Sequence, residues 1–574
     1  MSLDCVLNTA VRSAPPWYPC PGTLVAARAN ADLWTSEGDR IPRQLCRVCG
    51  RVCVGVCVCA LMLMMWVLVL SGATAVLLLL LWMLLTCLPR RSGQPTHKTS
   101  AQPKDAHSRP LFSLSSLLPH RVSPSLPGPP SLPLLGNLLD LMQDHLPGHL
   151  TSLSRCYGNI FRLRCGKTTM VVLSSAETIK EALVTKWSDF AGRPHSYTGD
   201  LVSGGGCSIS LGDYSEKWKA HRRLVHGALQ RCCAVSLHAV IERQALALRQ
   251  VILDYNQKPV DLLEDFTVAA SNVITSLVFG KADNKSSAEL RRLHDCLNEI
   301  VSLWGSPCIS ALDSFPLLRK LPNPPFSRLL KEVERRDDII RSHLEDFKVS
   351  QQRSANPNVC ATVYVQMLTE THVHMATVDL LIGGTETTAV WLYWMVAFLL
   401  HRPEVQASVY SELCTVLESR YPRYSDRHRL PYLSALVSEV LRIRPVAPLA
   451  VPHRATRDSS IAGYFIPKDT IIIPNLYGAH HDPAVWDDPD TFKPERFLEG
   501  KGASTRALLP FGGGARLCLG ASVARMEVFL FTAYLLRDFQ FLPTGGKASL
   551  PDLKGVASVV LKAKPFRVTV RPRP

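Results

Sequence analysis

The chain has 574 residues, of which 47% are hydrophobic and 20% are charged. This composition can bury a large core and excludes a mostly disordered protein. Its 64 basic and 48 acidic residues leave a formal net charge of +16, which favours an anionic membrane surface or an acidic protein partner. No nucleic-acid-binding motif accompanies this charge, so we expect no nucleic acid among the partners.

The 18 cysteines are scattered along a long chain, a distribution that argues against a disulfide framework. One dense cluster, 46–59, contains a Cys-x-x-Cys pair with the spacing of half a zinc site. A second ligand pair at a suitable spacing is missing, so zinc is not expected there.

Residues 52–89 carry no charged side chain and are dominated by Leu, Val and Met. A membrane-spanning helix needs only about 20 such residues, so this stretch is predicted to be a membrane anchor, preceded by an N-terminal extension, 1–51. Arginines flank both ends, and the positive-inside rule is therefore nearly balanced. Two arrangements stay open: a helical hairpin broken near Ser71-Gly72, or one anchor whose extension does not belong to the working protein.

Residues 90–126 are rich in Ser, Pro, Lys and Arg, which predicts a basic linker beside the membrane. A catalytic domain is predicted over 127–574, beginning with a stiff proline-rich turn, 127–133. Amphipathic helical patterns dominate this domain, and short apolar runs at 169–173 and 470–473 predict strands. The fold class is therefore mainly α with small β-sheets.

The segment 510–520 reads Pro-Phe-Gly-Gly-Gly-Ala-Arg-Leu-Cys-Leu-Gly and leads into a helical pattern. Glycines let the backbone wrap closely around the sulfur of Cys518, and the N-terminus of the next helix favours a thiolate. Arg516 offers a forked donor suited to a carboxylate. The segment resembles the heme-binding loop of the cytochrome P-450 family, which implies the cytochrome P-450 fold with an N-terminal membrane anchor, heme b, and Cys518 as the ligand of its iron.

A second motif, Gly-Gly-Thr-Glu-Thr-Thr at 383–388, lies inside an apolar helical run, 378–400. Each glycine destabilises a helix by about 1 kcal/mol relative to alanine, so two glycines at this place indicate a functional or packing requirement. In the resembled family this helix crosses the heme, a local bulge admits oxygen, and an acid-alcohol pair relays protons. The resemblance implies that Thr387 hydrogen-bonds dioxygen and that Glu386 supplies protons through water. Without the resemblance, a helix N-cap or a solvated polar patch would explain the pair equally well.

Glu439 and Arg442 are three residues apart, which puts them on one helix face. With Arg496, in a Pro-Glu-Arg-Phe segment, they match the buried ion network of the family. We assign these three residues to folding and heme insertion, because buried charges must keep their partners.

Other positions match residues that bind the heme propionates in the family's steroid-hydroxylating members. Trp218 and Arg222 have the Trp-x-x-x-Arg spacing, which puts both on one helix face. Arg193 and His453 match two further propionate-binding positions, and Arg516 completes the predicted set. Taken without the resemblance, Arg193 and His453 would each be read as surface residues.

Three stretches, 208–215, 378–388 and 473–480, resemble the steroid 21-hydroxylases within the family. The resemblance implies hydroxylation of progesterone and 17-hydroxyprogesterone at carbon 21, with Arg336 bound to the ring ketone and Asp379 lining the pocket. An exposed helical charge and a satisfied buried carboxylate are the plain alternatives for these two residues. The small Ala447 could loosen the pocket and alter where the steroid is hydroxylated.

Two other functions stay open: a steroid 17-hydroxylase/17,20-lyase, and a membrane protein that binds heme without turnover. The 17-hydroxylase group usually begins its oxygen motif with Ala-Gly, whereas this chain has Gly383-Gly384. The favoured resemblance implies these partners: a steroid, membrane lipid, and a flavoprotein reductase that passes electrons from NADPH. It also implies the endoplasmic reticulum membrane, with the catalytic domain facing the cytosol.

Overall fold

The computed structural model describes residues 125–133, 135–280, 287–351, 369–498, 502–546 and 549–574. The predicted extension, anchor and cysteine cluster, and most of the predicted linker, lie outside these residues. Residues 125–133 contain no helix, and the Pro127 carbonyl accepts a hydrogen bond from the Arg162 N–H at 2.7 Å. The proline-rich run is therefore tied to the first strand.

Helices dominate the described residues, as the periodicity predicts. The α-helices are α3 (Leu138–Leu141), α4 (Leu146–Tyr157), α5 (Ala176–Lys180), α6 (Trp187–Phe190), α7 (Tyr197–Val202), α8 (Glu216–Asp254), α9 (Leu263–Phe279), α10 (Ser287–Trp304), α11 (Pro307–Ser314), α12 (Pro324–Gln351), α14 (Glu370–His401), α15 (Pro403–Leu417), α16 (Pro431–Ile443), α17 (Leu476–His480), α18 (Gly502–Ala507) and α19 (Ala521–Asp538). Shorter turns of 3₁₀ or π type are η2 (Glu181–Thr185), η4 (Pro316–Lys320), η5 (Tyr424–His428), η6 (Pro494–Phe497) and η7 (Gly514–Arg516).

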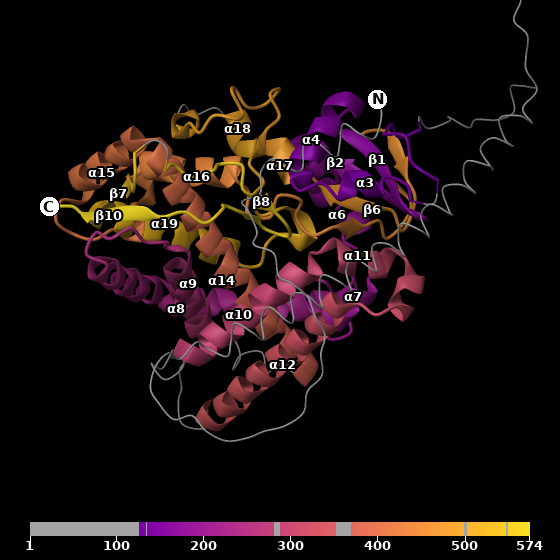
Figure 1. The fold of residues 1–574 in the computed structure, drawn as a ribbon, viewed down its shortest axis with the longest axis horizontal. Coiled ribbons are helices and arrows are strands. Elements are labelled where there is room, and N and C mark those ends of the chain that lie inside the picture. The colour runs from indigo at the N-terminus through magenta and orange to yellow at the C-terminus, as the bar shows by residue number, and fades with distance from the viewer. Residues whose placement is uncertain (1–124, 134, 281–286, 352–368, 499–501, 547–548) are drawn as a thin grey trace, which may run out of the picture. The chain divides into compact units, whose positions relative to one another are not determined.

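The strands are short and form small sheets. They are β1 (Ile160–Cys165), β2 (Thr168–Leu173), β3 (His453–Arg454), β4 (Ser459–Ile461), β5 (Tyr464–Ile466), β6 (Ile471–Pro474), β7 (Phe539–Pro543), β8 (Val556–Ala557), β9 (Leu561–Lys562) and β10 (Val568–Pro572). The largest sheet has the order β1-β2-β6-β3, with β2 and β6 parallel and the other neighbours antiparallel. Figure 1 shows β1, β2 and β6 side by side. Both predicted strands are thus confirmed.

Helix α14 passes through the middle of the helical part, between α9 on one side and α16 and α19 on the other (Figure 1). It carries a long buried stretch from Ala389 to Leu400, which joins the side chains of α8, α9, α16 and α19 in one hydrophobic cluster. Helix α8 is the one described helix that is long and apolar enough to cross a membrane by those two measures. It packs against α9 and α19 as a helix of this domain.

The two glycines of the Gly-Gly-Thr-Glu-Thr-Thr motif at 383–388, called the oxygen motif below, have different structural roles. A Cβ on Gly384 would lie 2.7 Å from Cγ1 and 2.9 Å from Cβ of Ile274 on α9. A Cβ on Gly383 would meet nothing within 4 Å. The α-helix is continuous through the motif, so the expected local bulge is not seen in α14, and the space beside the motif lies at Gly383. Gly384 brings two helices together, whereas Gly383 leaves space.

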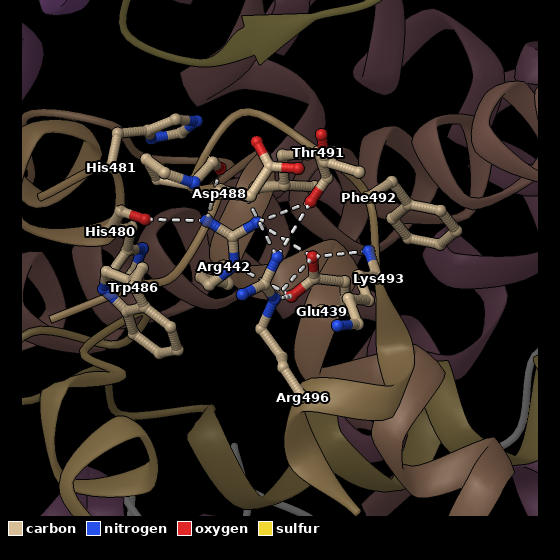
Figure 2. A network of polar contacts seen from close by, with 12 residues as sticks. Glu439, Arg442, His480, His481, Trp486, Asp488, Thr491, Phe492, Lys493 and Arg496 are labelled. Atoms are coloured by element: carbon tan, nitrogen blue, oxygen red, sulfur yellow. Dashed lines mark hydrogen bonds and ion pairs between the residues drawn. The ribbon is translucent and has the colours of Figure 1, made fainter. Parts of the chain in front are cut away.

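The predicted ion network of Glu439, Arg442 and Arg496 is confirmed (Figure 2). Arg442 donates from Nε and Nη2 to the two carboxylate oxygens of Glu439, each at 2.8 Å, and Arg496 Nε lies 3.1 Å from Glu439 Oε2. Backbone carbonyls of His480 and Thr491, among others, accept the remaining guanidinium protons. The network therefore ties α16 to α17, η6 and the loop between them.

We predict that Gly384→Ala lowers the unfolding temperature, because the added methyl group cannot fit without separating α14 from α9. Overpacking of this kind costs about 1–3 kcal/mol, partly offset by the better helix propensity of alanine. Gly383→Ala is the matched control and should keep or raise the unfolding temperature. Thermal unfolding followed by circular dichroism measures both; equal destabilisation of the two variants would contradict this account.

A second prediction concerns Glu439→Gln, which leaves the buried Arg442 and Arg496 without a counter-charge. Breaking a buried ion pair in this way costs about 3–5 kcal/mol. Glu404→Gln, which removes an exposed pair with Arg402, should cost no more than about 1 kcal/mol. Denaturant unfolding gives the comparison, and similar losses in both variants would refute a special role for the network.

Candidate active site

A cavity of about 360 Å³ lies between α14, α19, α8 and the loop before α19. Most of its wall is apolar, with Ile274, Leu380, Val446 and Val451 among the contributors. Cys518 and Thr387 both line it, so the structure brings the two predicted motifs to one site.

The loop holding Cys518 is shaped by one glycine in particular. Gly514 has a φ of +61°, and a Cβ there would lie 1.6 Å from the Leu183 carbonyl oxygen of η2. Only glycine meets both demands. The Cys518 N–H donates to the Phe511 carbonyl at 3.0 Å, which closes the loop just before α19 begins.

The Cys518 thiol lies in an interior environment although it faces the cavity. Burial raises its pKa, while the Gly520 N–H and the positive charge of Arg222 act in the opposite direction. The two opposing groups both favour a thiolate, which is the form that binds a metal. Cys518 is therefore supported as a ligand by its neighbours.

The cavity wall near Cys518 holds three arginines: Arg193, Arg222 and Arg516. Burial, and then Arg222, lowers the pKa of Arg193 to about 9, and burial, and then Arg193, lowers that of Arg516 to about 8. Asp213 is the one carboxylate that counteracts these shifts, and it also binds Arg454 at 2.6 Å. The wall thus carries an excess of positive charge, buried at Arg193 and partly buried at Arg222 and Arg516.

Backbone carbonyls hold these arginines in position. Arg193 donates to the carbonyls of Ser210, Val451 and Pro452, each at 2.9 Å. Arg516 donates to those of Ala191, Ile209 and Gly212. Arg222 donates to the carbonyl of Leu517, next to Cys518.

Trp218 does not line this cavity in the structure. Its indole Nε1 donates to the Ile209 carbonyl at 3.0 Å, and its ring lies 3.8 Å from the Arg516 guanidinium carbon. Trp218 therefore supports Arg516 through a cation–π contact.

His453 lines the cavity and is neutral. Burial, with Arg193 and Arg516, keeps its pKa well below the usual value, and Nδ1 lies 2.7 Å from the Phe190 carbonyl. Because a carbonyl only accepts, Nδ1 carries the proton and Nε2 does not.

On α14, Thr387 and Glu386 face different spaces. The Thr387 hydroxyl donates to the Gly383 carbonyl at 2.7 Å and lies on the cavity wall. Glu386 pairs with Lys562 of β9 and borders a second cavity, of about 550 Å³, whose wall includes Asp261, Arg291 and His294. Neighbouring helical residues point about 100° apart, which explains the separation.

Asp379 lines the first cavity one turn before the glycines. Its carboxylate accepts from the Ile209 N–H at 2.5 Å and from the Ser210 hydroxyl at 2.6 Å. Burial raises its pKa to about 6, against these bonds and the charge of Arg336. Arg336 is 1% exposed, so it is not a surface charge, and it donates to the Val202 carbonyl at 2.8 Å. It is not among the residues that line the cavity.

Sequence reasoning missed Glu527, Thr388 and Lys562. Glu527 lies four residues after Val523 and so on the buried face of α19, a position where an acid stands out among apolar neighbours. Lys562 carried no signal, because its contact with Glu386 joins segments far apart in the chain.

These residues fit heme. A bound heme would find a thiol for its iron, an apolar wall for its ring, and buried arginines whose uncompensated charge suits two propionates.

Three comparisons with known proteins agree on the family. The family model "Cytochrome P450" matches residues 126–570. Human steroid 21-hydroxylase is 44% identical over 462 residues, covering 77% of this chain and 92% of the relative, and the bovine enzyme is 43% identical with 77% and 91% covered.

Among solved structures, a zebra fish cytochrome P450 described as a structure with progesterone is 35% identical, with a TM-score of 0.67; it covers 74% of this chain and 99% of that chain. A second zebra fish structure, with abiraterone, is 36% identical with a TM-score of 0.66, and 74% and 98% are covered. The chain therefore belongs to the cytochrome P450 family, and its cofactor is heme, reduced with electrons from NADPH through a reductase.

Proposed function

We propose that this protein hydroxylates progesterone and 17-hydroxyprogesterone at carbon 21. The main observation in favour of a monooxygenase function is that Cys518 and Thr387 line the same largely apolar cavity. The steroid is supported by the similarity to steroid 21-hydroxylases of several mammals at 41–44% identity. Their identity to this chain exceeds that of the zebra fish structures, at 35–36%.

Cys518 is proposed as the iron ligand, and Arg193, Arg222, Arg516 and His453 as the propionate-binding residues. The buried charge of the arginines supports this role, because each propionate would relieve an unfavourable concentration of like charge. Trp218 contributes by fixing Arg516.

Arg336 and Asp379 are proposed as substrate-binding residues. Asp379 supports the proposal directly, since it lines the cavity and is held by two hydrogen bonds. Arg336 is supported by its burial and by its electrostatic interaction with Asp379. Arg336 Nη1 donates to the carbonyl of Val202, the last residue of α7. A shift of that segment would free this N–H to donate to a ring ketone.

The heme supplies the activation of dioxygen when it is bound through a thiolate. The chain's own part is to bring protons to it. Glu386 borders a polar cavity that suits water, while the Thr387 hydroxyl lies on the catalytic wall. The pair therefore lies at the boundary between the two cavities, with Lys562 paired to the Glu386 carboxylate on the polar side.

The same proposal includes the cell location. The protein is inferred to sit in the endoplasmic reticulum membrane through residues 52–89, with its catalytic domain in the cytosol. The long uncharged run of that segment supports the anchor, and the paired Arg90 and Arg91 after it support the orientation.

We predict that the protein, combined with a flavoprotein reductase and NADPH, converts progesterone to the 21-hydroxylated product. Product identification by mass spectrometry against authentic standards is the measurement. Cys518→Ser, the control, should lose the activity, because a serine hydroxyl does not supply a thiolate. Hydroxylation at carbon 17 alone would replace this proposal by the 17-hydroxylase function, and heme-bound protein that forms no product would favour a non-enzymatic heme protein.

We also predict that Thr387→Ala keeps heme content and steroid binding but forms less product and more hydrogen peroxide per NADPH. The physical reason is that general acid–base assistance, about 10²–10⁴-fold, is partly lost when the hydroxyl is removed. Thr377→Ala is the matched control, since its hydroxyl bonds to the Val373 carbonyl one helical turn back and does not line the cavity. NADPH, peroxide and product are measured together, and unchanged coupling in Thr387→Ala would assign the proton relay to another group.

A further inference from the structure

Glu527 is a buried acid that the proposed mechanism does not use. It lies on α19, is 1% exposed and borders the Cys518 cavity. Its Oε2 accepts a hydrogen bond from the Thr388 hydroxyl of α14 at 2.8 Å, whereas Oε1 is buried with no hydrogen-bond partner. Among the described residues, no Lys, Arg or His forms an ion pair with it.

Electrostatics decides the form of this carboxyl group. A lone buried carboxylate is so costly that such a group neutralises instead. Accordingly, burial raises the pKa of Glu527 to about 8, even though the Thr388 hydroxyl acts to lower it. Of the neighbouring elements, α8 faces Glu527 with Cys233, a thiol whose pKa is raised to about 12 by burial, by Cys232 and by Glu527. That thiol stays neutral and adds no charge.

We propose that Glu527 is a positioning residue of the oxygen motif: as a neutral carboxylic acid on α19, it binds the Thr388 hydroxyl and fixes the turn of α14 that carries Thr387. The bond joins the helix that follows the Cys518 loop to the helix that carries the oxygen motif. The effect on Thr387 rests on the function proposed above for that residue, whereas the neutral state of Glu527 does not depend on it.

The neutral state is tested on the heme-bound protein, without steroid or turnover. Because the pKa in the folded protein exceeds the ordinary value of 4.5, the stability that this proton contributes is complete below about pH 4.5 and is lost by about pH 8. The unfolding temperature of the wild type should therefore fall relative to that of Glu527→Gln between pH 5 and pH 8. A difference that does not change with pH would overturn the proposal.

Infrared difference spectra give a second, independent readout. At pH 7 the wild type should show a carboxylic acid C=O band that shifts in deuterium oxide and is missing from Glu527→Gln. If the variant lacks only carboxylate bands, Glu527 is ionised and the proposal is wrong.

The link to the oxygen motif is tested with Thr388→Val and Glu527→Leu. Each should keep heme but raise the peroxide released per NADPH, and the double variant should be no worse than either one, because both remove the same bond. Glu527→Gln, which can still accept from Thr388, should restore coupling. Thr532→Val is the control, since its hydroxyl on α19 bonds only to the Val528 carbonyl. Additive effects, or a response equal to that of the control, would reject the positioning role.

Discussion

The buried positive charge beside Cys518 is the interaction on which the rest of the site depends. Arg193 is buried and Arg516 is partly buried, so water solvates these charges poorly and the protein must supply acceptors. It does so with backbone carbonyls from separate segments, around 191, 209–212 and 451–452. The guanidinium groups therefore link segments that are far apart in the chain. The cofactor's carboxylates complete an arrangement that the protein alone leaves with an excess of charge.

Helix α14 separates two chemical environments, and this division explains how the adjacent acid and alcohol can serve different purposes. The face with Gly383 and Thr387 belongs to an apolar cavity, while Glu386 belongs to a polar one. A regular helix is sufficient to place Glu386 and Thr387 on different cavities. The expected local bulge is not seen: α14 is a continuous α-helix through the motif, and the missing side chain at 383 leaves space on that face.

Much of this could be predicted from the sequence, because the informative residues are close together in the chain. The Cys518 loop, the glycine motif and the Glu439–Arg442 pair each occupy one short segment, where spacing determines geometry. The helical class and two strands followed from periodicity in the same way. Contacts between segments far apart in the chain could not be predicted from spacing or periodicity. Examples are Glu386 with Lys562, Thr388 with Glu527, and the turning of the Trp218 indole toward Ile209.

The contact between Gly384 and Ile274 also bears on how this protein can change over evolution. The two positions share one fixed volume at the crossing of α14 and α9, so the residues that fill it are not independent. A larger residue at 384 becomes acceptable only with a smaller one at 274 and a small separation of the two helices, because even alanine at 274 keeps the Cβ that would lie 2.9 Å from the added atom. Substitutions that alter the oxygen motif are therefore expected to arise together with compensating changes on a helix that contributes no chemistry.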